Sequence, residues 1–164
     1  MRRLARIAAT ATLLVLLVSG TSSCGDYSCH DNGSSLPLAA CYVGSSQQAV
    51  SGLTIMGIGV PGDSLLLDSA TVSEVYLPLR ASTTSTSFRL RRAVTANGVT
   101  TFYNDTLTID YQSIEFFHSV ECGAMFNFDV KHVSCTEHGI DSVVLVNNLI
   151  TNSRRPALRI YFTQ

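Results

Sequence analysis

Few residues in this chain combine the types and the spacing that a catalytic or cofactor site requires. Residues 57–62 read Gly-Ile-Gly-Val-Pro-Gly and match the G-x-G-x-x-G pattern of dinucleotide-binding loops. That pattern binds a pyrophosphate where a helix follows it and presents its N-terminus. Pro61, Gly62 and Asp63 instead predict a turn into another strand. We therefore expect no nucleotide and no other cofactor here.

A second group of residues has the chemical types of a zinc site. His132, Cys135 and His138 lie three residues apart, with Glu137 beside the last of them, and imidazole nitrogen and thiolate sulfur are common ligands of Zn²⁺. Residues three apart on a strand point to opposite faces, so the site would require a loop at residues 136–139. The simpler interpretation is a disulfide-bonded Cys135 flanked by solvated histidines, and we assign no metal site.

Motifs of hydrolases give no clearer signal. The chain has no G-x-S-x-G, S-x-x-K or H-E-x-x-H sequence. Glu115 and Glu121 flank His118 and have the residue types of a glycosidase carboxylate pair, but we expect them on a loop or a strand exterior. Only the fold can show whether a serine, His118 and an aspartate converge. We assign no catalytic residue and expect a protein that is not an enzyme.

Length and composition limit what kind of protein this is. The chain has 164 residues, of which 46% are hydrophobic and 14% charged, with a net charge of −1. This size suits one globular domain, and the hydrophobic content excludes a disordered chain. A nucleic-acid binder needs a clustered basic surface, which this charge balance does not supply. We therefore expect no nucleic-acid partner.

The first residues have the features of an export signal. Arg2, Arg3 and Arg6 form a basic start, and residues 7–18 are an apolar stretch too short to span a bilayer. The small residues before Cys24 resemble the lipobox of bacterial lipoproteins, in which the cysteine is lipidated after cleavage. Thr21 departs from that motif, so ordinary signal-peptidase cleavage stays open as an alternative. The lipobox interpretation makes 1–23 a signal peptide and anchors the chain to a membrane through Cys24.

The remaining cysteines agree with export. Lipidation of Cys24 leaves four cysteines that can form two disulfides in an oxidising envelope. Four cysteines allow three pairings, and spacing alone does not choose among them. The four are Cys29, Cys41, Cys122 and Cys135.

The rest of the chain predicts short strands. Residues 24–48 are rich in Gly, Ser, Asn and Asp and indicate a tether with a short ordered lead-in, so we place the folded domain at 49–164. Apolar residues there recur with period two, as in the run Leu53, Ile55 and Gly57, and Asn97-Gly98 predicts a hairpin turn. Seven or eight such runs and no helical periodicity predict an all-β antiparallel sandwich, which we expect to be immunoglobulin-like.

Five segments of the chain carry a resemblance to a known family: 63–68, 75–80, 104–109, 121–126 and 158–162. Together they resemble an uncharacterised family of Bacteroidales cell-envelope lipoproteins over most of residues 24–164. The resemblance implies an outer-membrane location and a β-sandwich, suggests a β-barrel outer-membrane protein as partner, and supplies no activity. It also implies a disulfide between Cys29 and Cys122, which leaves Cys41 and Cys135 as a second bridge or as two free thiols.

Four triplets have the form Asp, then Ser or Thr, then a small or aliphatic residue. They resemble the O-glycosylation sequon of this bacterial group, and a glycan at one of them would protect an exported surface. Asp-Ser and Asp-Thr also open turns before strands, which would enrich the triplet without any sugar. The candidate acceptors are Ser64, Ser69, Thr106 and Ser142.

These observations favour a lipid-anchored protein of the cell envelope, which we expect in the outer membrane. Its expected role is that of a non-catalytic interaction or structural module. Capture of a small ligand or glycan is the alternative, and hydrolysis is the third hypothesis. An exposed aromatic groove would favour capture, converging Ser, His and Asp side chains would favour an enzyme, and an open apolar edge would favour a protein partner.

Overall fold

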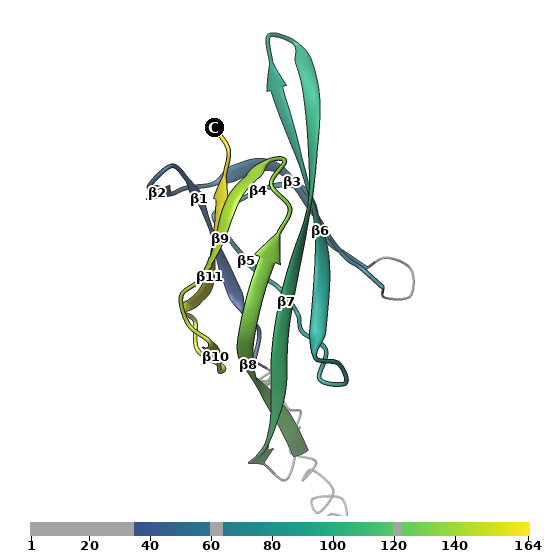
Figure 1. The fold of residues 1–164 in the computed structure, drawn as a ribbon, viewed down its shortest axis with the longest axis vertical. Helices are drawn as coiled ribbons and strands as arrows, with labels where there is room; N and C mark the ends of the chain where they lie inside the picture. Colours follow the sequence, from purple (N-terminus) through teal and green to yellow (C-terminus); the bar gives the residue numbers. More distant parts are fainter. Residues whose placement is uncertain (1–34, 60–63, 120–122) are drawn as a thin grey trace, which may run out of the picture. The chain divides into compact units, whose positions relative to one another are not determined.

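The computed structural model describes residues 35–59, 64–119 and 123–164, and every regular element in these ranges is a β-strand. Two sheets form the layers of a sandwich (Figure 1), which confirms the predicted fold class. The described residues contain no helix long and apolar enough to cross a membrane. The eleven strands of these ranges exceed the seven or eight predicted: β1 (Leu38–Val43), β2 (Ser46–Gln47), β3 (Val50–Gly57), β4 (Leu65–Val72), β5 (Glu74–Tyr76), β6 (Ser85–Ala96), β7 (Val99–Ser119), β8 (Gly123–Cys135), β9 (Ile140–Leu145), β10 (Leu149–Ile150) and β11 (Pro156–Phe162).

The two sheets differ in size and in strand direction. The five-stranded sheet has the order β2-β1-β11-β9, with β5 also paired to β1. In it β1 and β11 run parallel, whereas the other pairings of the described residues are antiparallel. The six-stranded sheet has the order β10-β8-β7-β6-β3-β4. One hydrophobic core takes side chains from both sheets.

The ordered sandwich begins earlier than the sequence predicts. The predicted tether 24–48 contains β1, and its residues Ala39 and Cys41 are buried in the core. The period-two rule misses β1 because a central strand that is covered on both faces is a short continuous apolar run without alternation. The domain therefore includes β1, and the boundary near residue 49 is too late.

Strands that have only one face buried show the expected alternation of buried and exposed residues. On β6, Phe88 and Leu90 are buried while Arg89 and Arg91 are exposed. On β7, Leu107, Ile109 and Tyr111 point to the same core. These positions have the spacing of two that a half-buried strand requires.

Strand β7 is much longer than its neighbours in the sheet. Its 21 residues span roughly 65 Å at the usual rise of a strand. It pairs with β6 from Val99 to Asp110 and with β8 from Leu107 to Ser119. Residues 93–104, which we call the β6–β7 arm, therefore project as a two-stranded ribbon beyond the last β3 pair at Arg92 and the first β8 pair at Leu107. The arm lies at the top of Figure 1, and the β7–β8 hairpin lies at the opposite end.

The turn of the β6–β7 arm is the one that the sequence predicts. Asn97 and Gly98 both have positive φ, 53° and 76°. A two-residue hairpin turn with both φ values positive matches the right-handed twist of the flanking strands, and Asn-Gly tolerates it best. The Asn-Gly prediction is therefore confirmed.

Two glycines with similar φ values give a matched stability prediction. Gly52 has φ 66°, and an added Cβ would lie 2.5 Å from the carbonyl oxygen of Ala93, whereas Gly98 has open space around it. We expect Gly98→Ala to cost about 1 kcal/mol through its backbone conformation alone, and Gly52→Ala to cost at least about 2 kcal/mol because β3 and β6 must also separate. Urea unfolding monitored by circular dichroism measures both. Equal losses would show that the close approach of Gly52 to Ala93 is unimportant.

Candidate functional site

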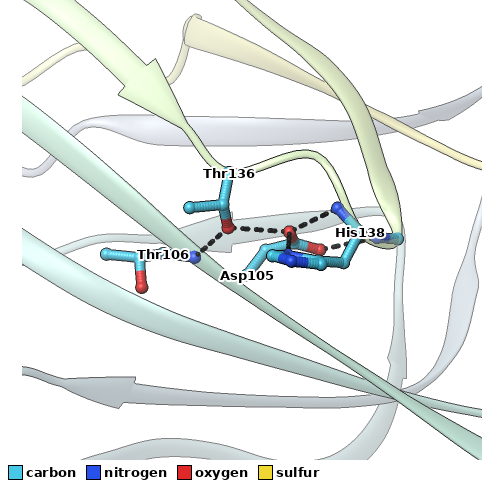
Figure 2. A network of polar contacts seen from close by, with 5 residues as sticks. Asp105, Thr106, Thr136 and His138 are labelled. Carbon is cyan, nitrogen blue, oxygen red and sulfur yellow. Dashed lines mark hydrogen bonds and ion pairs between the residues drawn. The ribbon is translucent and has the colours of Figure 1, made fainter.

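The most elaborate polar site of the described residues is built around Asp105, a buried carboxylate on β7 (Figure 2). Oδ1 accepts hydrogen bonds from the hydroxyl of Thr136 at 2.8 Å, the backbone N–H of His138 at 2.8 Å and the ring Nδ1 of His138 at 3.1 Å. Oδ2 accepts the backbone N–H of Gly139 at 2.8 Å. The carboxylate therefore holds the loop between β8 and β9 against β7.

Opposing effects act on the pKa of Asp105. Burial alone raises the pKa, because it disfavours the charged form. The backbone N–H groups of His138 and Gly139, followed by the side chains of Thr136 and His138, favour the carboxylate and outweigh burial, so the pKa lies below its usual range. We infer that Asp105 is ionised at neutral pH and accepts all of these bonds as a charged acceptor.

The Asp105–His138 pair has part of the geometry of a catalytic dyad. A carboxylate on Nδ1 fixes the ring tautomer and leaves Nε2 as an acceptor facing solvent, and the His138 side chain is 66% exposed. A dyad of this kind acts on a hydroxyl or thiol that hydrogen-bonds Nε2. No residue of the described ranges makes a hydrogen bond to Nε2 of His138. His138 and Asp105 therefore form no Ser-His-Asp arrangement with the described residues.

An open hollow of about 620 Å³ lies beside this network. Backbone and side chains of Phe102, Tyr103 and Asn104 line it on one side, and Glu137 and His138 line it on the other. Phe102 is 50% exposed, and the guanidinium of Arg91 lies 4.4 Å from the centre of its ring. The hollow thus joins an aromatic surface to a carboxylate and an imidazole at the base of the β6–β7 arm.

The sequence marked Asp105 only as the first residue of a glycosylation triplet. A stronger signal was available, because Asp105 lies two residues before Leu107 in the period-two pattern and so occupies a core-facing position. A charged residue at such a position requires partners for its oxygens. The partners come from residues 136–139, about thirty residues along the chain, and no local pattern identifies them.

The candidate zinc residues do not come together. His132 pairs with Asp110 and is exposed, whereas Cys135 pairs with Leu107, which belongs to the core. His138 lies in the loop and contacts Asp105. Within the ranges that the structure describes, no three His, Cys, Asp or Glu side chains gather in a way that would hold a metal ion.

The glycine pattern at 57–62 begins at the end of β3, and β4 follows it from Leu65. A strand and not a helix therefore follows the pattern, while the predicted turn itself falls on Pro61, Gly62 and Asp63. Residues 60–63 lie outside the described residues, as do Cys24, Cys29, Glu121, Cys122 and the predicted signal peptide 1–23. Glu115 is exposed on β7. The predictions that depend on these positions stay predictions.

Cys41 and Cys135 are free thiols, so the structure forms no bridge between them. Cys41 is buried in the middle of β1, where it pairs with Ile160 of β11, and Cys135 ends β8 in the other sheet. Of the two alternatives given by the sequence, the structure contains the free thiols.

The thiol of Cys41 should be chemically inert in the folded protein. Burial, followed by the negative charge of Glu74, raises its pKa to about 11, and the thiolate is the reactive form. We expect no alkylation of Cys41 by iodoacetamide at pH 8 in native protein and complete alkylation in urea. Mass spectrometry of the digested protein measures this. Alkylation of Cys41 at equal rates in both states would contradict its burial in the core.

The four candidate glycosylation residues differ in exposure. Ser64, Ser69 and Ser142 are exposed, and Thr106 is half-buried beside Thr136, whose hydroxyl accepts its backbone N–H at 2.9 Å. Asp105 of the Thr106 triplet has the structural role described above. That triplet therefore has a structural explanation, whereas the other three present accessible hydroxyls.

Comparison with models of protein families gives a match. The model of the family of unknown function DUF6452 matches residues 52–162, which is more than half of the chain. The chain belongs to this family. No curated protein and no solved structure matches it. The DUF6452 match begins within β3 and so covers the six-stranded sheet, the Asp105 network and the hollow, while an immunoglobulin-like topology stays a prediction.

Proposed function

We propose that this DUF6452 protein is a lipoprotein of the cell envelope that acts as a non-catalytic interaction module, with an outer-membrane β-barrel protein as its partner. The observation that carries the proposal is the β6–β7 arm. A two-stranded ribbon is only marginally stable in water by itself, and this one presents Val99 and Phe102, 66% and 50% exposed. Large apolar side chains on a projecting ribbon are typical of a surface that contacts another protein.

The first described residue, Ser35, lies at the end of the sandwich opposite the β6–β7 arm. Ser35 is buried beside the β7–β8 hairpin, where its N–H bonds the carbonyl oxygen of Phe126 at 3.2 Å and its hydroxyl bonds Oδ1 of Asn127 at 2.7 Å. Ser35 follows Cys24 by eleven positions, a reach of at most about 40 Å. A lipid on Cys24 would therefore tether Ser35 within at most about 40 Å of the membrane surface.

The same contact supports the bridge between Cys29 and Cys122. Cys29 precedes Ser35 by six residues and Cys122 precedes Phe126 by four, so the chain lengths from the Ser35–Phe126 bond permit the two cysteines to meet. We expect a non-reducing digest to yield one peptide pair that contains Cys29 and Cys122, and reduction to cost about 4 kcal/mol of stability through the long loop that opens. Recovery of both as free thiols from freshly lysed cells would contradict the bridge.

Crosslinking in the native cells tests the proposed function. Cells that express the tagged chain are treated with formaldehyde, and the tagged complexes are identified by mass spectrometry. The proposal predicts one dominant membrane-protein partner, which is lost in Cys24→Ala because that variant is no longer held at the membrane. A set of unrelated neighbours that does not change in Cys24→Ala would contradict it.

The hollow at Phe102 and His138 favours ligand capture as a second candidate function. Its exposed aromatic ring, its carboxylate and the free Nε2 of His138 are groups that bind sugar hydroxyls and rings. Titration with monosaccharides and short glycans, followed by tyrosine fluorescence, tests this function. Saturable binding that Phe102→Ala abolishes would favour capture over the interaction module.

A further inference from the structure

The β6–β7 arm has one strand edge without a partner in the described part of the chain. β7 pairs with β6 along this whole stretch, but β8 joins its other side only at Leu107. Beyond that point, Thr136 closes the edge by one more residue, because its N–H bonds the carbonyl oxygen of Thr106 and its hydroxyl accepts the N–H of Thr106. Strand β7 continues for seven residues past this closure, from Asp105 to Val99.

The register determines which backbone groups point to that open side. Both backbone groups of Thr106 point away from β6, and the groups of an antiparallel strand alternate between its two sides. The β6–β7 pairing has no register shift, so the N–H and C=O of Asn104, Phe102 and Thr100 also point away from β6. These three residues present three donors and three acceptors at the spacing of a strand.

The side chains at this edge do not prevent another strand from pairing. Proteins usually protect such an edge with lysine, proline, a bulge or a covering loop. Thr100, Phe102 and Asn104 include neither lysine nor proline, and the hollow of about 620 Å³ leaves the edge open beside Glu137 and His138. A strand placed here would continue the position that β8 occupies farther along β7.

We propose that the free edge of β7 from Thr100 to Asn104 binds an extended segment of a partner protein as an added β-strand. This inference rests on the proposed function, because it names the surface through which the module would hold its partner. Backbone hydrogen bonds to the three open residues supply the affinity. Apolar side chains opposite Phe102 and a basic side chain beside Glu137 supply the preference for sequence.

The occupant is a different protein and not a second copy of this chain. Two copies joined through this edge by a two-fold axis would pair their β7 strands antiparallel. Centred on Phe102, such a pair would place Gly98 of one copy opposite Thr106 of the other. Thr136 already closes the edge at Thr106, so the second copy would meet an occupied position.

The test uses the membrane-purified chain in detergent, with the capped peptide Lys-Val-Lys-Val-Lys-Val-Lys as the probe. Amide hydrogen exchange is followed by NMR. Added peptide should slow the exchange of the Thr100, Phe102 and Asn104 amides by about tenfold or more. The amides of Thr101 and Tyr103 already face β6 and serve as internal controls, which should not change. A peptide with proline at its central position has the same charge and should give no protection.

Variants distinguish binding at the β7 edge from nonspecific binding to exposed apolar side chains. Asn104→Pro removes one donor on the open side and Phe102→Ser removes the apolar contact, and each should weaken peptide binding by about tenfold. Val99→Ser removes a more exposed apolar side chain whose backbone faces β6, and it should change binding less than about twofold. Circular dichroism checks that each variant is folded. If Asn104→Pro does not fold, peptide binding by Phe102→Ser alone tests the proposal.

Three results would overturn the proposal. The first is the absence of protection at millimolar peptide, and the second is protection at the edge of β9 instead. The third is protection of Phe102 in the protein alone, with a doubled mass in solution, which would assign the edge to a second copy. None of these readouts depends on an anchor at Cys24, so their failure is distinct from the failure of the envelope assignment.

Discussion

Replacing Asp105 with alanine is expected to lower the free energy of unfolding by about 3 kcal/mol, because two backbone N–H groups lose a charged acceptor. The N–H groups of His138 and Gly139 donate to this carboxylate, and Gly139 is buried, so water does not fully replace the bond. The hydroxyl of Thr136 loses its acceptor as well. Chemical unfolding followed by circular dichroism measures the loss, with Asp141→Asn as a control at an exposed carboxylate.

The pH dependence gives the same prediction an independent readout. The folded pKa of Asp105 lies below its usual range, so its contribution to stability is complete above the unfolded pKa of about 4 and is lost as the pH falls through the folded value. The wild type should therefore lose more stability than Asp105→Ala between neutral pH and pH 3. Parallel losses in the two proteins would show that the carboxylate is not held as the structure has it.

Replacing Tyr111 with alanine is expected to cost about 5 kcal/mol, since it removes a buried ring and the acceptor of a buried network. The ring packs edge-on against the ring of Phe128, with 5.2 Å between the two ring centroids. Its hydroxyl donates to the carbonyl oxygen of Arg80 at 2.9 Å and accepts the N–H of Arg80 at 3.0 Å, and it also contacts Thr86 at 2.6 Å. One side chain thus holds the segment between β5 and β6 onto the six-stranded sheet.

A smaller substitution at Tyr111 separates the contribution of the ring from that of the hydroxyl. Tyr111→Phe keeps the ring and removes the hydroxyl, so we expect a loss of about 2 kcal/mol from the unpaired groups of Arg80 and Thr86. Tyr76→Phe is the matched control because Tyr76 is 44% exposed, and it should change stability by less than about 0.5 kcal/mol. Urea unfolding of the four proteins measures both parts. Equal effects of the two Tyr→Phe changes would contradict the network at Arg80.

Strands with one face on the core and the other on solvent were predictable from the sequence. The strand that is covered on both faces was not. Period two identifies β3, β6 and β7 because each has one face on the core and one on solvent, as Phe88 and Arg89 show. β1 lacks alternation since Ala39, Ala40 and Cys41 are all buried. The short strands β2 and β10 have two residues each, and tertiary pairing rather than local pattern defines them.

The candidate site was predictable only in its parts. The sequence identified His138 as a chemical residue, but it grouped His138 with His132 and Cys135 by spacing. The structure instead joins His138 to Asp105, which lies across the sheet edge. Spacing along the sequence cannot reveal this contact, because it depends on the β8–β9 loop lying beside β7 in the folded protein. The free edge of β7 is likewise a property of pairing, since it depends on where β8 ends.

Site-specific photocrosslinking in the native cells tests the central claim, an anchored module that binds its partner through the β6–β7 arm, most directly. Benzoylphenylalanine is placed at position 102 in the arm or at position 65, where Leu65 of β4 is 53% exposed at the other edge of the same sheet. The account predicts one dominant membrane-protein adduct from position 102, its absence from position 65, and its loss when Cys24 is alanine. Identical adducts from both positions, or an adduct from position 102 that does not need Cys24, would contradict it.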